Sequence, residues 1–176
     1  EGLPLLRVQH HEAHAAACMG ENGFTGEGLA LALDGVGLGT DGTLWGGEIL
    51  AGRPGAFRRA AHLRQVPQPG GDRAALEPWR MAAAHLRAFL GEGWTRLPLP
   101  CFADRPGSDR SGLHAMMEKG LVSPPTSSCG RLFDAAAAML GFAGGPGGRI
   151  LYSAQAPMEL EALAAGGRNP GDYGVG

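Results

Sequence analysis

The sequence predicts an α/β domain in which a twisted sheet of mixed strand direction is flanked by helices. Two observations carry this prediction. Between residues 28 and 63, apolar stretches are separated by tight, glycine-rich turns, which is typical of consecutive strands. From residue 79 onward, apolar positions recur at helical spacing and alanine-rich segments follow. A chain that places its strands first and its helices afterwards builds a sheet with helices packed around it.

Length and composition indicate one ordinary globular domain. The 176 residues fit the usual domain size, 44% of them are hydrophobic, and the net charge is −2. This balance argues against a disordered chain and against a nucleic-acid partner. No apolar stretch reaches the ~20 residues of a membrane span, so no membrane partner is expected. Three widely spaced cysteines give no disulfide framework and favour a cytoplasmic location.

Turn signals and propensities place the elements of the first half. Strands are expected at residues 3–8, 28–33, 44–51 and 56–63. Residues 11–19 are rich in alanine and predict a helix that ends at Gly20 or Gly23. Asp41 and Gly42 form a strong hairpin signal within a glycine-rich loop between two of the strands.

The second half is expected to be helical and to share a single core with the sheet. Helices are expected at residues 79–90, 112–120, 129–141 and 158–165. Pro78 suits the first turn of the first of these helices. Ser108 or Ser111 could cap the second helix, and a Thr-Ser-Ser run at residues 126–128 precedes the third.

Two histidines at helical spacing suggest a metal site. His10 and His14 are four residues apart, so a helix places both imidazoles on one face, one turn apart. Imidazoles placed in this way can share a divalent metal at about 2.0–2.1 Å. Asp34 ends an apolar stretch that reads as a buried strand, and its carboxylate could supply a third ligand. The alternative is a pair of solvated histidines, but this order of elements favours a metal.

Two further segments could bind an anion. The first is the glycine-rich loop at residues 35–40, because glycines let backbone N–H groups approach an anion closely. This loop joins two expected strands, so it is not a dinucleotide-binding or P-loop motif. The alternative is a plain glycine-rich hairpin. The candidate positions in this loop are Gly35, Gly37, Gly39 and Thr40. Ser127, Ser128 and Arg131 stand at an expected helix start, where anions bind well, unless they only cap the helix and pair with Asp134.

Other polar residues are weaker candidates. Arg80 in the segment 77–80 could face a ligand, although a surface arginine is equally consistent with the sequence. Cys129 reads as a buried structural thiol rather than a nucleophile, and no residue is assigned a catalytic role. A metal site beside anion-binding segments suits a nucleotide–metal enzyme of phosphate chemistry.

These segments also resemble a known family. The resemblance lies in ordered motifs at residues 8–14, 33–35, 45–48, 69–72, 77–82 and 126–135. They are similar to the C-terminal, Kae1-like region of the HypF family, whose members are carbamoyltransferases of nickel–iron hydrogenase maturation. The resemblance implies an actin/Hsp70/sugar-kinase type of fold, with a partial Kae1-like carbamoyltransferase domain at residues 1–165 and a glycine-rich end at 166–176. We expect such a partial domain to need the rest of a longer protein for activity.

The resemblance also implies a reaction and its partners. HypF proteins make carbamoyl-adenylate from carbamoyl phosphate and ATP and transfer the carbamoyl group to the C-terminal cysteine of HypE. By resemblance, His10, His14 and Asp34 hold zinc or iron beside a bound nucleotide. Glu12 stands where HypF more often has histidine and is similar to tRNA-modifying relatives. Alternatives are therefore a tRNA threonylcarbamoyl- or O-carbamoyltransferase, and a non-catalytic module that binds a nucleotide or a partner.

Overall fold

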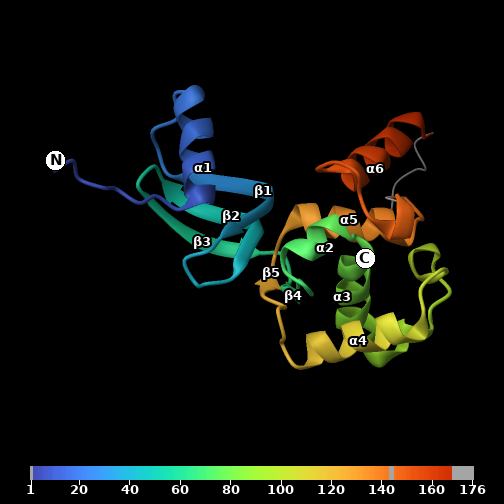
Figure 1. Ribbon diagram of the computed structural model, residues 1–176. Coiled ribbons are helices and arrows are strands. Elements are labelled where there is room, and N and C mark those ends of the chain that lie inside the picture. Colours follow the sequence, from blue (N-terminus) through green and yellow to red (C-terminus); the bar gives the residue numbers. More distant parts are fainter. Residues whose placement is uncertain (1, 143–144, 168–176) are drawn as a thin grey trace.

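Figure 1 shows a computed structural model of the chain, which describes residues 2–142 and 145–167. Its strands are β1 (Gly28–Leu38), β2 (Leu44–Arg53), β3 (Ala56–His62), β4 (Val66–Pro67) and β5 (Pro125–Thr126). Its α-helices are α1 (His10–Glu21), α2 (Asp72–Leu76), α3 (Trp79–Leu90), α4 (Gly107–Glu118), α5 (Cys129–Met139) and α6 (Gln155–Gly166). Short 3-10 turns lie at Gly91–Arg96, Pro100–Phe102 and Pro146–Gly148. Within these described ranges, none of the helices is long and apolar enough to cross a membrane.

The sheet is mixed, as predicted. β2 pairs antiparallel with β1 and β3, and β5 adds to β2 in parallel and to β4 antiparallel. The hairpin between β1 and β2 turns at Gly42, whose φ of +78° suits glycine. Helix α1 packs on this sheet, and the remaining helices form a second part joined to it through β4 and β5 (Figure 1).

Two predictions for the first half are wrong. Residues 3–8 form no strand, because a strand needs a backbone partner and none of the described residues pairs with this segment. Its apolar side chains are largely exposed, with Leu3 93% exposed. The glycine-rich stretch that begins at Asp34 is not a loop up to Thr43, because β1 continues to Leu38 with a register irregularity between Leu33 and Gly37.

The helix predictions were mostly confirmed, with different caps in places. Helix α3 covers the predicted residues, and Ser128 caps α5 by accepting a hydrogen bond from the backbone N–H of Arg131. Ser108 and Ser111 cap nothing, because α4 already begins after Pro106 and both serines lie inside it. α6 begins at residue 155 rather than 158. The expected glycine-rich end lies outside the described residues from position 168 onward.

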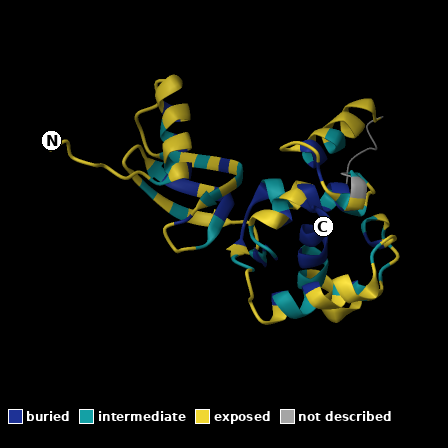
Figure 2. Cartoon of the chain, in the orientation of Figure 1, coloured by how far each residue is buried: buried dark blue, intermediate teal, exposed yellow. Residues whose placement is uncertain are grey.

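The expectation of a single core is also wrong. Buried side chains form separate clusters, and the largest one lies among α3, α4 and α5, around Trp79 and Trp94. A smaller cluster of Ala15, Trp45 and Leu50 joins α1 to the sheet. A third lies between α5 and α6. Figure 2 shows the buried residues concentrated on β2, α3 and α5. Between α1 and the sheet, the cluster of buried apolar side chains is the small one of three residues.

Glycines let β1, β2 and α5 approach one another at the level of the backbone. A Cβ at Gly47 would lie 2.5 Å from the carbonyl oxygen of Ser127, and one at Gly46 would lie 2.6 Å from that of Asp34. A Cβ at Gly130 would lie 2.9 Å from the Cα of Gly35. Backbone atoms cannot move aside as the end of a flexible side chain can. Glycine is therefore required wherever the start of α5 contacts the two strands.

We expect Gly47→Ala to destabilise the protein by about 3 kcal/mol, because the new methyl group overpacks a contact with backbone. Gly20→Ala in α1 is the matched control, since a Cβ there has no heavy atom within 4 Å. It should stabilise the protein by up to about 1 kcal/mol through helix propensity. Urea unfolding measures both changes. Equal effects of the two substitutions would show that the contact at Gly47 is not tight.

Candidate metal centre

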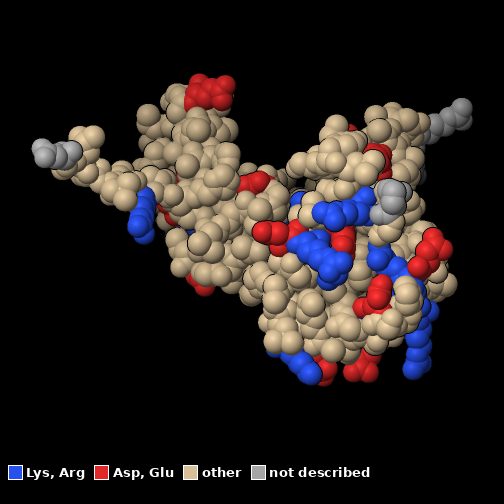
Figure 3. All heavy atoms as spheres, viewed as in Figure 1, with Lys and Arg blue, Asp and Glu red and all other residues tan. Residues whose placement is uncertain are grey.

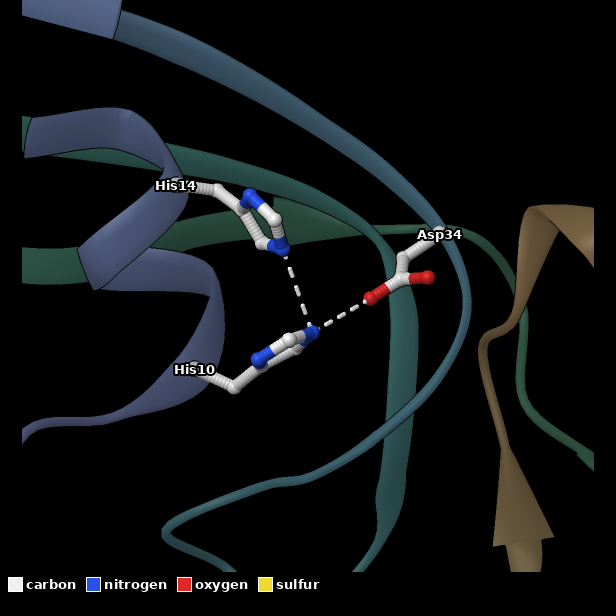
Figure 4. Close-up of side chains that lie close together, drawn as sticks. All are labelled: His10, His14 and Asp34. Carbon is white, nitrogen blue, oxygen red and sulfur yellow. Dashed lines mark hydrogen bonds and ion pairs between the residues drawn. The ribbon is translucent and has the colours of Figure 1, made fainter. Parts of the chain in front are cut away.

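Helix α1 and strand β1 bring the three predicted metal ligands together. His10 opens α1, where Gln9 caps the helix by accepting from the backbone N–H of Glu12, and His14 follows one turn later. Nε2 of His10 lies 2.8 Å from Oδ2 of Asp34 and 3.2 Å from Nε2 of His14 (Figure 4). One ligand atom from each of the three residues lies within 4.8 Å of the others. The sequence-based grouping of these residues therefore matches the geometry.

The arrangement fits a divalent cation better than a proton. Two atoms bound to one zinc at about 2.0–2.2 Å are separated by roughly 3–3.5 Å, close to the two shorter separations found here. If Nε2 of His10 carries a proton, it can donate to Asp34 but cannot accept from Nε2 of His14. If it carries no proton, it can accept from His14 but has nothing to donate to Asp34. A cation between the three lone pairs satisfies all of them at once. The residues present therefore fit a metal.

The cluster opens on solvent and on a groove. The side chains of His10 and Asp34 are 50% and 30% exposed, which leaves open positions for a substrate group. A groove of about 670 Å³ runs between α1 and β1, and His14 and Asp34 lie on its wall together with apolar residues such as Leu31. A bound molecule could thus reach the metal ligands from one side.

Asp34 is held in its ionised form. Burial on its own would raise the pKa of this carboxyl group, but hydrogen bonds from the Gly35 N–H and from His10 outweigh burial and lower the pKa. The Gly35 N–H lies 2.5 Å from Oδ1 of Asp34, which leaves Oδ2 facing the histidines. An ionised carboxylate is the form that binds a metal.

Buried His11 lies beside the same carboxylate. Oε1 of Gln9 accepts from Glu12, so its Nε2 is the donor that lies 3.0 Å from Nδ1 of His11. Nδ1 is then the acceptor, and Nε2 carries the proton. That Nε2 is buried, has no hydrogen-bond partner among the described residues, and lies 3.8 Å from Oδ2 of Asp34. The sequence offered one signal for this residue, a histidine next to a predicted ligand.

The candidate glycines of the first anion segment have packing roles. A Cβ at Gly37 would lie 2.6 Å from the ring of His11, and one at Gly39 would lie 2.0 Å from Nε1 of Trp45. The N–H of Gly39 donates to the carbonyl of Thr43, and Thr40 is exposed in the turn. Close packing in a tight hairpin therefore explains the glycines at positions 37 and 39. Binding of an anion at Gly35, Gly37, Gly39 and Thr40 stays a prediction.

The second anion segment is tied to the metal cluster through Ser128. Its hydroxyl donates to the carbonyl oxygen of Gly35, at 2.5 Å, and lies 3.2 Å from that of Asp34, while its Oγ accepts from the N–H of Arg131. The start of α5 is thereby fixed against the backbone of Asp34, one of the three candidate ligands. Ser127 bonds instead to the buried Glu48. Arg131 lies beside this helix start, with its Nη2 3.9 Å from a Cβ placed on Gly35.

A buried charge network that the sequence analysis missed supports this junction. Glu48 has no exposed surface and accepts from Nε of Arg59 at 2.6 Å and from the hydroxyl of Ser127. Arg59 also pairs with Asp41 at 2.8 Å and stacks over Trp45. Burial would raise the pKa of Glu48, but its hydrogen-bond donors outweigh burial and lower it. The signal in the sequence for this network was a charged residue, Glu48, inside the apolar stretch 44–51.

A second buried pair lies one helical turn into α5. Oδ2 of Asp134 lies 3.0 Å from Nη1 of Arg131, but neither atom has a hydrogen bond among the described residues. Burial raises the pKa of Asp134 to about 6, although Arg131 acts to lower it. The protonated form of this carboxyl group is therefore favoured by folding.

We expect the free energy of unfolding to fall between about pH 4 and pH 6.5 through Asp134. A carboxyl group whose pKa is raised in the folded state contributes stability below its unfolded pKa and loses it as pH rises through the folded value. The shift of about two pKa units corresponds to about 3 kcal/mol. Urea unfolding of the protein and of Asp134→Asn at both pH values isolates this contribution. Parallel pH profiles for the two proteins would contradict it.

Comparisons with known proteins agree with this architecture. Residues 30–176 match the family model described as the carbamoyltransferase Kae1-like domain, second subdomain. The chain is 48% identical to carbamoyltransferase HypF2 of Cupriavidus necator and 46% identical to carbamoyltransferase HypF of Rhodobacter capsulatus. Both alignments cover 93% of this chain. A crystal structure of full-length HypF in the phosphate- and nucleotide-bound form is similar with a TM-score of 0.80 and 34% identity over 92% of the chain.

The similarity is confined to one part of these longer proteins. The chain spans 19% and 21% of the two relatives and 20% of the crystallised HypF chain. The family model begins after His10 and His14 but includes Asp34, whereas the alignments to the relatives cover nearly all of the chain. The predicted α/β fold with a mixed sheet and flanking helices is confirmed by the structural match. The chain belongs to the HypF carbamoyltransferases and corresponds to the second subdomain of their Kae1-like domain.

Proposed function

We propose that this chain takes part in metal-dependent transfer of a carbamoyl group from carbamoyl-adenylate to the C-terminal cysteine of HypE, in the maturation of nickel–iron hydrogenase. The observation that carries the proposal is the convergence of His10, His14 and Asp34 beside a groove that His14 and Asp34 line. The names of its relatives support carbamoyl transfer. The phosphate- and nucleotide-bound state named for the crystallised HypF supports carbamoyl phosphate and ATP as substrates of the whole protein.

The chemistry assigns the chain a binding and orienting role. The thiolate of the acceptor attacks the carbamoyl carbon, the bond from that carbon to the phosphate oxygen breaks, and AMP leaves with the electron pair. His10, His14 and Asp34 would hold zinc or iron, which neutralises charge on the phosphate as a Lewis acid. Ser128 holds the backbone at Asp34 in place, and the groove beside α1 offers room for the substrate. Unpaired cysteines suit a cytoplasmic reaction.

The test uses a full-length HypF protein that carries this chain at the corresponding position. Carbamoylation of HypE is followed by mass spectrometry, with His10→Ala and His14→Ala as variants and His62→Ala as an exposed control. We expect each of the first two variants to abolish transfer and the control to retain it. Unchanged transfer in both ligand variants would overturn the proposal. A preference for tRNA over HypE would favour the tRNA-modifying alternative, and binding of nucleotide without any transfer would favour a non-catalytic module.

We infer that His11 favours the ionised form of Asp34 electrostatically, because its Nε2 lies 3.8 Å from Oδ2 without a hydrogen bond. Replacing it by phenylalanine keeps the ring volume but removes this polar group, and zinc affinity should fall by about tenfold at most, the lower end of the loss for an outer partner of a ligand. Glutamine at position 11 can place an N–H near the same point and should restore most of the affinity. Calorimetric titration of the chain with zinc measures the three affinities. Equal affinity of the phenylalanine variant and the unchanged chain would show that His11 only fills space.

A further inference from the structure

A second pocket, lined by arginines, lies in the helical part of the protein. It has a volume of about 450 Å³, and none of its lining residues belongs to α1 or β1, so it is separate from the metal cluster. Its charged and aromatic lining residues are Arg73, Glu77, Trp79, Arg80, Arg105 and Asp109. On the face drawn in Figure 3, arginine and lysine side chains gather over the helical part with acidic side chains among them.

Arg80 has more donors than the described residues satisfy. It is only 7% exposed, and its Nε donates to Oε2 of Glu77 at 2.6 Å. No other hydrogen bond of this guanidinium is found within residues 2–142 and 145–167, although the group offers five N–H donors. Glu77 also accepts from Arg73 at 2.8 Å, so both of its oxygens are already used. The two outer nitrogens of Arg80 can therefore donate to a molecule in the pocket.

Trp79 lines the same pocket, with its ring against both arginines. The residue is 4% exposed, and the Nε1 atom of its indole is itself buried. The guanidinium carbon of Arg105 lies 3.9 Å from the ring centroid and that of Arg80 lies 5.0 Å from it. A guanidinium can only donate. A partner for the outer nitrogens of Arg80 is therefore an acceptor.

The charge of the pocket has the matching sign. Three arginines face two carboxylates, those of Glu77 and Asp109, which leaves one positive charge in excess. Burial lowers the pKa of Arg105 and Arg80 lowers it further, against the raising effects of Glu77 and Asp109. Two guanidinium groups that disfavour each other's charge gain from an anion bound near both. Arg105 itself is held by the carbonyls of Cys101 and Gly147.

We propose that this pocket binds an oxyanion, either a phosphate or a carboxylate group, through the outer nitrogens of Arg80 and the guanidinium of Arg105, beside the ring of Trp79. Both anions present two acceptor oxygens to a guanidinium. Separate titrations with phosphate and with acetate distinguish them. The sequence named Arg80 as a residue that could face a ligand, and the structure adds the pocket and its other donors.

The three tryptophans make the test specific. Each gives one indole N–H signal in a ¹H–¹⁵N NMR spectrum, and only Trp79 faces the pocket. The chain is titrated with inorganic phosphate and, separately, with acetate at constant ionic strength. We expect a saturable shift of the Trp79 signal with at least one anion, while the Trp45 signal, whose N–H is bonded to Asp41, stays in place. The anion that binds more tightly identifies the group recognised.

Variants separate a specific site from general attraction. Arg80→Gln should weaken binding about tenfold or more, and Arg105→Gln should have the same direction of effect. Arg87→Gln on the same helix is the control, because it removes the same charge outside the pocket. Unshifted Trp45 and Trp94 signals report that each variant is folded. The proposal is overturned if Trp79 does not respond to either anion up to about 10 mM, or if Arg87→Gln weakens binding as much as Arg80→Gln.

Discussion

Replacing Arg59 by methionine is expected to destabilise the protein by about 3–5 kcal/mol. The side chain of Glu48 is fully buried, and Arg59 is the cation that pairs with it, at 2.6 Å. Removing one partner of a buried ion pair leaves the other charge uncompensated in a medium of low polarity. Loss of stacking on Trp45, 4.3 Å from the guanidinium carbon, adds to the effect. Urea unfolding at neutral pH measures the change.

Two further variants separate the buried charge from the loss of a side chain. Arg58→Met removes an exposed arginine from the neighbouring position of β3 and should change stability by less than about 0.5 kcal/mol. Glu48→Gln combined with Arg59→Met removes both charges while keeping an acceptor for Ser127. This double variant should regain part of the loss. If it is no more stable than Arg59→Met alone, the unpaired carboxylate is not the cause.

Replacing His10 and His14 together by alanine is expected to weaken zinc binding about 10⁴-fold. Structural zinc sites with four protein ligands bind with about 10–16 kcal/mol, which corresponds to about 3 kcal/mol for each ligand. Losing two ligands therefore removes about 6 kcal/mol. Titration of the chain against a competing chelator measures the affinity.

His62→Ala is the control for this experiment. His62 is exposed on β3, and within the described part of the chain its ring bonds only to the neighbouring carbonyl of Leu63, through Nδ1. Its replacement should leave zinc affinity unchanged. The three-ligand assignment would be contradicted if this control lost as much affinity as the double variant, since zinc would then be held by scattered histidines.

Local patterns predicted much of the fold and the ligand grouping. The apolar stripe of α3, the turn at Gly42 and the helical spacing of His10 and His14 depend on residues close in sequence, which is why they could be read from it. Asp34 joined the group because its place at the end of an apolar stretch was also a local signal.

The remaining features depend on contacts between distant residues. Ser128 bonds to the carbonyl of Asp34, 94 positions away, and Gly47 is required only because Ser127 lies against it. The strand expected at residues 3–8 had apolar composition but no pairing partner, which composition cannot reveal. The orientation of His11 needed the hydrogen bonds of Gln9 to assign its proton. None of these contacts leaves a periodic signal in the sequence.

X-ray diffraction at the zinc absorption edge, from crystals of this chain grown with zinc, tests the three-ligand site most directly. We expect one anomalous peak within about 2.0–2.2 Å of Nε2 of His10, Nε2 of His14 and a carboxylate oxygen of Asp34. A zinc peak bound elsewhere, with His10 still hydrogen-bonded directly to Asp34, would contradict it.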